Sequence, residues 1–390
     1  MNKAKVLSFI KANTMVIALI IITAFFVWKT GGKIMLPQNV SNLISQNAYV
    51  FILATGMLLC ILTGGNIDLS VGSIVCFVGA TGATLMENKD VNWVIAVIFM
   101  LILGIAIGAW QGFWIAYVRI PPFITTLAGM LIFRGLSNVV LDGLTVSLTN
   151  TTFIKLFGGG ADCYIPDFFK VEGFNLTAML AGVIACVLYL VLQIQSRIKK
   201  AKKGYEMEPM VNMLAKSVII SAVILAFTYQ LSRYRGIPTA LVIVVIVVLV
   251  YGYITSKTTV GRHFYAVGGN EKATKLSGIN TNRIYFLAYT NMGFLSALAG
   301  MMTIARLTSA QPSYGQNYEL DAIGSCFIGG ASAYGGIGKV SGVIIGALLM
   351  GVINLGMSIM GVDANWQKVV KGGVLLGAVI FDVVSKKKSN

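Results

Sequence analysis

The sequence predicts an all-α polytopic membrane protein, a single domain over residues 1–390 with about twelve transmembrane helices. Hydrophobic residues make up 56% of the chain and charged residues only 11%, about half the charged fraction of an ordinary soluble domain. Apolar runs of about 20 residues, enough to cross a bilayer core as a helix, recur from one end to the other. The 43 glycines lie mostly within these runs, where small residues let neighbouring helices approach closely in lipid.

Twelve apolar runs are expected to cross the membrane. They cover residues 13–28, 43–62, 69–86, 93–116, 122–141, 176–195, 216–232, 237–255, 283–305, 320–335, 340–360 and 368–384. The first is expected to remain as an anchor, because Trp28, Lys29 and Thr30 stand where a cleavable signal peptide needs small residues. Some of these helices are expected to be interrupted at glycines, as happens in many transporters around a polar pathway.

The basic residues predict the orientation of the chain. Loops rich in Lys and Arg stay in the cytoplasm, and the most basic loop, "SRIKKAKK" at 196–203, and the tail "SKKKSN" then both fall inside. This places both termini in the cytoplasm. The net charge of +16 is assigned to topology and lipid attraction rather than to nucleic acid, since no basic stripe with interleaved aromatics occurs outside these loops.

Catalytic chemistry finds little support in the sequence. The single histidine, His263, lies in a predicted cytoplasmic loop without partner residues. The carboxylate pair Glu319 and Asp321 is expected at a helix start on the outer face, where it suits the helix dipole. The pair Glu206 and Glu208 lies in a charged loop. We therefore expect no catalytic residues.

Metal and nucleotide sites are also not expected. The five cysteines show neither CxxC nor Cys/His spacing, which argues against a zinc site and against a disulfide framework. The stretch "GGIGKVSG" at 335–342 is not a phosphate-binding loop, because Ala333 replaces the first required Gly and Val340 the required Ser or Thr. Its glycines are better explained as a break between two spans.

The stretch "TGGNIDLSVGS" at 63–73 places a carboxylate between two apolar runs. Gly64 and Gly65 can end one helix, and Asn66 and Asp68 can cap the next. Ionisable residues at membrane depth also commonly mark a solute pathway. Asp68 is thus a candidate for either role, with the cap favoured by its predicted position toward the cytoplasm.

Arg134, in "LIFRGLSNVV", is another charged residue within an expected span. A buried guanidinium needs partners inside the protein. It can pair with Asp68 or with backbone carbonyls, and the Asp68 pair is a hypothesis for the structure to test.

Two loops are candidates for contacts with other proteins. The longest non-membrane segment, residues 141–175, suits either an external partner or a passive loop. In the cytoplasmic segment 266–283, Asn270 can cap a short helix, Glu271 and Lys275 can form an i,i+4 pair, and Gly278 can end it. We interpret this helix as a docking site, since it lacks the bulky apolar face of a helix that lies on lipid.

At these residues the sequence resembles the membrane permeases of bacterial sugar ABC importers, the group that includes the ribose, galactose and xylose systems. The matching stretches occur in family order over nearly the whole chain: "ILTGGNIDLSVGS", "FITTLAGMLIFRG", "GRHFYAVGGNEKATKLSGI", "ARLTSAQPSYGQNYELDAIGSCFIGGASAYGGIGKVSG" and "NWQKVVKGGVLLGAVIFD".

The resemblance implies a permease that works as two copies, with an ATP-binding subunit docked inside and a sugar-binding protein outside. No cofactor is implied for this chain, because ATP is held by the partner subunit. The ATPase-coupling loop then comprises Gly269, Asn270, Glu271, Ala273, Leu276 and Gly278. The candidates for the translocation path or its helix breaks are Asn66, Asp68, Ser70, Ser73, Arg134 and Asn291.

Residues 172–236 read as two additional spans relative to ribose-type permeases, an insertion that resembles xylose-type and multiple-sugar permeases. This favours xylose or several aldoses as cargo. Two rival functions remain open, an ATP-driven importer of branched-chain amino acids and an ion-coupled secondary transporter. The scarcity of intramembrane carboxylates argues against the latter.

Overall fold

The computed structural model describes residues 13–158, 163–205 and 209–387, and most of these residues are helical. The helices are α2 (Thr14–Lys29), η1 (Lys33–Met35), α3 (Pro37–Leu62), α4 (Val71–Ala83), the π-helical turn η2 (Thr84–Asn88), α5 (Trp93–Ala116), α6 (Pro122–Leu141), α7 (Thr151–Phe157), α8 (Leu176–Lys202), α9 (Met210–Ser232), α10 (Thr239–Lys257), α11 (Thr259–Gly269), α12 (Glu271–Leu276), α13 (Thr281–Leu307), α14 (Tyr318–Ile328), α15 (Val340–Ile359) and α16 (Ala364–Lys387). The described strands are β1 (Val146–Ser147) and β2 (Ser309–Ala310), which pair antiparallel.

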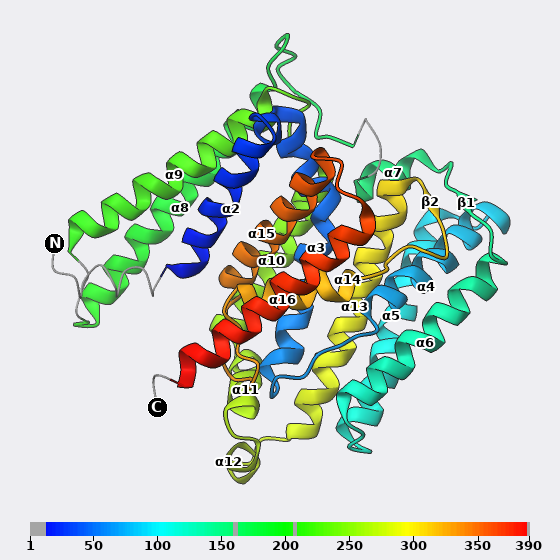
Figure 1. The fold of residues 1–390 in the computed structure, drawn as a ribbon. Helices are drawn as coiled ribbons and strands as arrows, with labels where there is room; N and C mark the ends of the chain where they lie inside the picture. The colour runs from blue at the N-terminus through cyan, green and yellow to red at the C-terminus, as the bar shows by residue number, and fades with distance from the viewer. Residues whose placement is uncertain (1–12, 159–162, 206–208, 388–390) are drawn as a thin grey trace.

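Eight of the described helices are long and apolar enough to cross a membrane: α3, α5, α6, α8, α9, α10, α13 and α15. The predicted class, an all-α polytopic membrane protein, is confirmed. We call the end of the bundle at α12 the inner end and the opposite end, which carries α7 and β1, the outer end (Figure 1). The expected anchor at 13–28 forms α2, and residues 1–12 lie outside the described part of the chain.

The expected span at 320–335 differs from the structure. Helix α14 has only 11 residues, about 16 Å at 1.5 Å per residue, about half of the 30 Å hydrocarbon core. It ends at Ile328 because Gly330, Gly335 and Gly336 adopt the left-handed backbone conformation, which glycine tolerates. The expected span at 69–86, in contrast, agrees with α4 and η2, which follow one another directly after the non-helical residues 63–70. Of these two segments, only 320–335 contains a short helix with irregular backbone after it.

Helix α3 forms the centre of the bundle, with 83% of its most apolar 18-residue window buried. Helices α13, α14 and α15 pack around it, and α5 packs along α13 (Figure 1). The α5–α13 contact depends on glycine, because a methyl group at Gly293 would overlap the carbonyl oxygen of Gly104 on the facing helix. Backbones in direct contact replace the hydrophobic force that lipid does not supply between helices.

Helices α8 and α9, within the expected insertion at 172–236, form a hairpin at one side of the molecule (Figure 1). Only 17% and 6% of their apolar windows are buried within the chain. Helix α9 packs against α3, and at the outer end the Asn175 N–H donates to the Ser232 carbonyl at 2.8 Å. The hairpin is therefore attached along one edge and leaves most of its apolar surface open to lipid or to another chain.

The close α5–α13 contact gives a first prediction. Gly293→Val forces the two backbones apart and should cost about 1–3 kcal/mol or more of stability, seen as less folded protein and a lower melting temperature in detergent. Gly252→Val on α10 is the control, because nothing lies within 4 Å of a side chain at that position. Equal stability of the two variants would contradict this account of the packing.

Candidate coupling surface and translocation path

Helix α12 protrudes from the inner end of the bundle (Figure 1). Its start is fixed by Asn270, whose Oδ1 accepts a hydrogen bond from the Ala273 N–H at 3.0 Å, an N-cap. Its end is followed by Gly278 with φ +83°, a conformation suited to glycine after a helix. The short capped helix expected from the sequence is thus present at this position.

Most of the predicted coupling residues lie on the outward surface of this loop. Leu276 is 89% exposed, and Gly269, Asn270, Ala273 and Gly278 are also exposed. Thr274 is buried and faces the bundle. A nearly fully exposed leucine at the tip of a fixed helix is typical of a contact with a partner protein. Burying an aliphatic side chain in an interface lowers the free energy, because its apolar surface leaves water.

Glu271 has a different place from the other coupling candidates. It forms an ion pair with Arg119 of the α5–α6 loop at 2.8 Å and accepts hydrogen bonds from the hydroxyls of Thr281 at 3.0 Å and Tyr285 at 3.1 Å. Burial raises the pKa of Glu271, but the hydrogen bond and charge of Arg119 outweigh it, so the pKa lies below its usual 4.5. The carboxylate is ionised at neutral pH and ties α12 to α13 and to the α5–α6 loop.

The expected Glu271–Lys275 pair is therefore wrong. Intrahelical pairs contribute only about 0.2–0.5 kcal/mol. The Glu271 carboxylate instead has three partners outside its own helix, Arg119, Thr281 and Tyr285. A single ion pair with Lys275 cannot replace them.

Helix α11 connects α12 to the broken segments of the bundle. Gly268 packs directly against the carbonyl of Leu62, the last residue of α3, and that same carbonyl accepts a hydrogen bond from the Gly336 N–H at 3.1 Å. The Tyr265 hydroxyl donates to the Gly338 carbonyl at 2.9 Å. Helix α11 is thus in contact with the inner end of α3 and with the loop that follows α14.

Asp68 lies in the non-helical stretch between α3 and α4 and is fully buried. Its Oδ1 accepts hydrogen bonds from the Ser70 N–H at 2.9 Å and the Ser70 hydroxyl at 2.6 Å, and Ser70 Oγ accepts one from Gln111 of α5 at 2.7 Å. Asp68 therefore closes the turn that leads into α4 and ties it to α5. Gln111 is a member of this cluster that the sequence interpretation missed.

The cluster also holds polar atoms that have no hydrogen-bond partner among the described residues. These atoms are Asp68 Oδ2 and Gln111 Oε1; the Ser73 hydroxyl on α4, outside the cluster, also has none. Buried polar groups are nearly always paired with protein or water. These atoms can still form hydrogen bonds, which fits contact with bound water or a passing solute better than a sealed apolar core.

The other path candidates are placed apart from one another. Asn66 donates to the Thr63 carbonyl at 3.1 Å and so supports the turn after α3. Asn291 on α13 faces α10, where its Oδ1 accepts the hydrogen bond of the Tyr251 hydroxyl. The structure gathers Asp68, Ser70 and Gln111 in one cluster, while Asn66 supports a turn and Asn291 joins two helices.

Arg134 does not pair with Asp68. Its Nη1 donates to the carbonyls of Pro312 at 3.1 Å and Tyr314 at 2.6 Å, in the irregular loop between α13 and α14. There Gly315 lies directly against Gly72 of α4. Carbonyls outside a helix at membrane depth must find donors within the protein. The hypothesis of an Arg134–Asp68 pair is thus wrong, and the alternative of backbone carbonyls holds.

A buried ion pair in the bundle was not predicted. Asp321 on α14 is 1% exposed, and Lys371 on α16 donates from Nζ to it at 3.0 Å. The Tyr49 hydroxyl of α3 donates to the same carboxylate at 2.6 Å. Asp321 lies in the first turn of α14, as expected, and its carboxylate also joins α14 to α3 and α16. The sequence did contain a signal for this pair. Asp321 and Lys371 lie in two expected spans, and a charged side chain within a span requires a partner.

The turn before α4 provides the second prediction. Asp68→Asn keeps an oxygen that accepts from Ser70 and should leave the folded amount and most activity intact. Asp68→Leu leaves two buried donors unpaired, at about 1–3 kcal/mol each, and should reduce folded protein. Quantitative blots and size-exclusion profiles measure this; a stable but inactive Asn variant would instead assign Asp68 a direct role in the path.

The third prediction concerns the anchor of α12. Glu271→Arg places two guanidinium groups together and should sharply reduce transport while the bundle stays folded. Arg119→Glu should do the same, and the double variant should recover part of the activity because the ion pair is restored in reverse. A double variant as inactive as either single variant would show that Glu271 acts by touching a partner rather than by positioning α12.

Comparison with known proteins gives one family match and close relatives. The family described as "Branched-chain amino acid transport system / permease component" matches residues 39–379. The xylose transport system permease protein XylH of Haemophilus influenzae is 38% identical, over 96% of each chain. XylH of Escherichia coli K12 is 36% identical over 96% of this chain and 92% of its own.

The ribose import permease protein RbsC of Escherichia coli K12 is 35% identical over 88% of this chain and 85% of its own. No solved structure matches. The matched region takes in the turn at Asp68, the loop held by Arg134 and the α11–α12 segment. The chain belongs to this family of transport-system permease components and is a multi-pass membrane permease.

Proposed function

We propose that this chain is the permease subunit of an ATP-driven importer that carries a neutral monosaccharide, with xylose as the first candidate, into a bacterial cytoplasm. The observation that carries this proposal is the exposed, capped helix α12, fixed by Glu271 and Arg119 and connected through α11 to the end of α3. The relatives in the xylose and ribose systems support the cargo class.

The proposed assembly has an ATP-binding subunit on α12 at the inner end and an extracytoplasmic sugar-binding protein at the outer end. Two permease copies enclose the solute path. ATP binding and hydrolysis in the partner move α12, and α11 passes the movement to the inner end of α3 and the 329–339 loop. The chain supplies geometry and no covalent chemistry. Both termini lie in the cytoplasm and the chain lies in the inner membrane.

The charged groups near the broken helices favour a neutral cargo over an amino acid. Arg134 is occupied by two carbonyls, Asp68 by Ser70, and Asp321 by Lys371 and Tyr49. An amino acid carries both charges of a zwitterion and would require a free carboxylate and a free cation in one site. The unpaired atoms Asp68 Oδ2 and Arg306 Nε do not lie in one site. Hydroxyls and amides such as Ser70, Ser73 and Gln111 suffice for a sugar.

The fourth prediction tests this function by uptake of labelled xylose, with ribose, glucose and galactose alongside, in cells with the chain and its partner subunits. Uptake should resist a protonophore while ATP is maintained and stop when ATP is depleted. Collapse with the proton gradient alone would identify a secondary transporter. Uptake of branched-chain amino acids and of none of the sugars would identify the other cargo class.

The same assay includes a matched pair of surface variants. Leu276→Asp replaces the exposed tip of α12 with a charge and should lower uptake at least tenfold with the normal amount of permease in the membrane. Tyr205→Asp, at a residue 63% exposed in the loop after α8, is the control for adding one surface carboxylate. Normal uptake by the Leu276 variant would argue against α12 as the docking site.

A further inference from the structure

A pocket of about 240 Å³ opens between α3, α13 and α14 in the outer half of the bundle, and we call it the outer pocket. Its lining residues are Ser45, Gln46, Ala48, Tyr49, Met302, Thr303, Arg306, Leu307 and Tyr318. Pockets for drug-sized ligands measure about 300–1,000 Å³, so this volume suits a smaller solute such as one sugar ring. It is separate from the turn at Asp68 and from α12.

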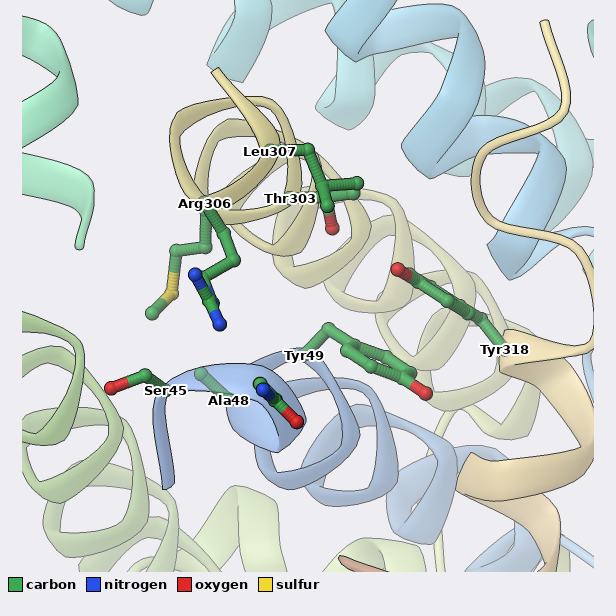
Figure 2. A pocket seen from close by; sticks show the side chains of 9 residues that line it. Ser45, Ala48, Tyr49, Thr303, Arg306, Leu307 and Tyr318 are labelled. Carbon is green, nitrogen blue, oxygen red and sulfur yellow. The ribbon is translucent and has the colours of Figure 1, made fainter. Parts of the chain in front are cut away.

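Two polar side chains of α13, Arg306 and Thr303, line the outer pocket. The Thr303 hydroxyl donates to the Ala299 carbonyl at 2.8 Å, so toward a ligand it can act as an acceptor. Figure 2 shows the Arg306 guanidinium reaching from α13 toward α3, with the Thr303 hydroxyl on the same side. Arg306 Nε is buried without a hydrogen-bond partner among the described residues. A guanidinium carries five N–H donors in a rigid fork. Such a group, left without an acceptor beside a cavity, is matched by a ligand that offers several oxygens.

The opposite wall of the outer pocket is aromatic. The rings of Tyr49 and Tyr318 stack with centroids 3.6 Å apart and planes 13° apart. In Figure 2 the Tyr318 hydroxyl points toward the pocket and the Tyr49 hydroxyl points away from it. Tyr49 is held in that direction by its 2.6 Å hydrogen bond to Asp321. Tyrosine presents an apolar ring together with a polar tip, a combination suited to a ring with hydroxyls on its edge and C–H groups on its face.

The position of the outer pocket suits the first step of import. Ser41, one helical turn before Ser45 on α3, is hydrogen-bonded at 3.1 Å to the hydroxyl of Tyr164. Tyr164 belongs to the long segment 141–175, which we call the outer loop. The outer loop is where an external delivery protein would dock. At the base of the pocket, Tyr49 leads through Asp321 to Lys371 on α16. The pocket therefore lies between the outer surface and the ion pair that joins α14 to α16.

We propose that the outer pocket is the first solute-binding site of the translocation path, where Arg306, Thr303 and the Tyr49–Tyr318 stack hold one neutral polyhydroxylated ring. This rests on the proposed function, because it assumes that the chain imports such a solute. Arg306 donates to adjacent hydroxyls, and the tyrosine rings pack on the apolar face. We expect the affinity of this site for the solute to be low, since the solute must leave it again toward the inner end.

The first test measures labelled xylose uptake in the complete importer over a range of sugar concentrations. Arg306→Met and Thr303→Val should each lower uptake at subsaturating sugar, Arg306→Met by tenfold or more, at an unchanged amount of permease. Arg306→Lys should lower uptake less than Arg306→Met does, because lysine keeps the positive charge but not the rigid fork of N–H donors. The matched control is Arg233→Met, at an exposed arginine outside the pocket, in the loop after α9.

The second test is direct binding, by saturation-transfer difference NMR of the purified permease with xylose and, separately, with xylonate. Xylose signals from the wild type that are lost in Arg306→Met and kept in Arg233→Met support the site. Signals from xylonate alone would overturn the neutral-ring assignment.

The outcomes also separate the two proposals. A wild type that imports no sugar would refute the proposed function itself. A wild type that imports xylose, with Arg306→Met and Thr303→Val as active as Arg233→Met, would refute the outer pocket while leaving the proposed function intact.

Discussion

The structure depends on one constraint, that backbone which leaves a helix at membrane depth must find its hydrogen-bond partners inside the protein. The chain leaves helical geometry between α3 and α4, between α13 and α14, and between α14 and α15. These breaks satisfy one another. The Leu62 carbonyl accepts from Gly336, Gly65 packs on Ala333, and Gly72 packs on Gly315. Arg134 supplies the donors that the α13–α14 loop lacks.

This arrangement places the mechanical parts next to one another. Because the breaks are packed glycine on glycine, a shift in one segment cannot be absorbed locally, since close-packed interiors transmit displacement. Helix α11 rests on the same Leu62 carbonyl through Gly268. Helix α11 therefore links the surface proposed for the ATPase to the irregular backbone that follows α3 and α14.

The charges inside the bundle serve the fold first. Asp68 closes a turn, Arg134 holds a loop, and Asp321 with Lys371 joins α14 to α16 while fixing Tyr49. Each is paired because an isolated charge in this environment is too costly. Arg306 differs, because its guanidinium makes no hydrogen bond or ion pair among the described residues and its Nε is buried. That difference distinguishes a group available to a solute from groups already committed to structure.

The sequence by itself determined the class, the position of most helices and the capped helix α12, because these follow from local rules: apolar length, capping by Asn270 and the left-handed Gly278. The insertion at 172–236 and the roles of the site residues stay predictions. Only the tertiary structure decided which partners the charges take. Glu271 pairs with Arg119, 152 positions away in the numbering, rather than with Lys275, and Arg134 binds carbonyls rather than Asp68. It also decided that α14 ends at Ile328 and that Tyr49, Thr303, Arg306 and Tyr318 share one pocket. Periodicity and composition report on each segment alone, whereas these contacts arise from how separate segments pack.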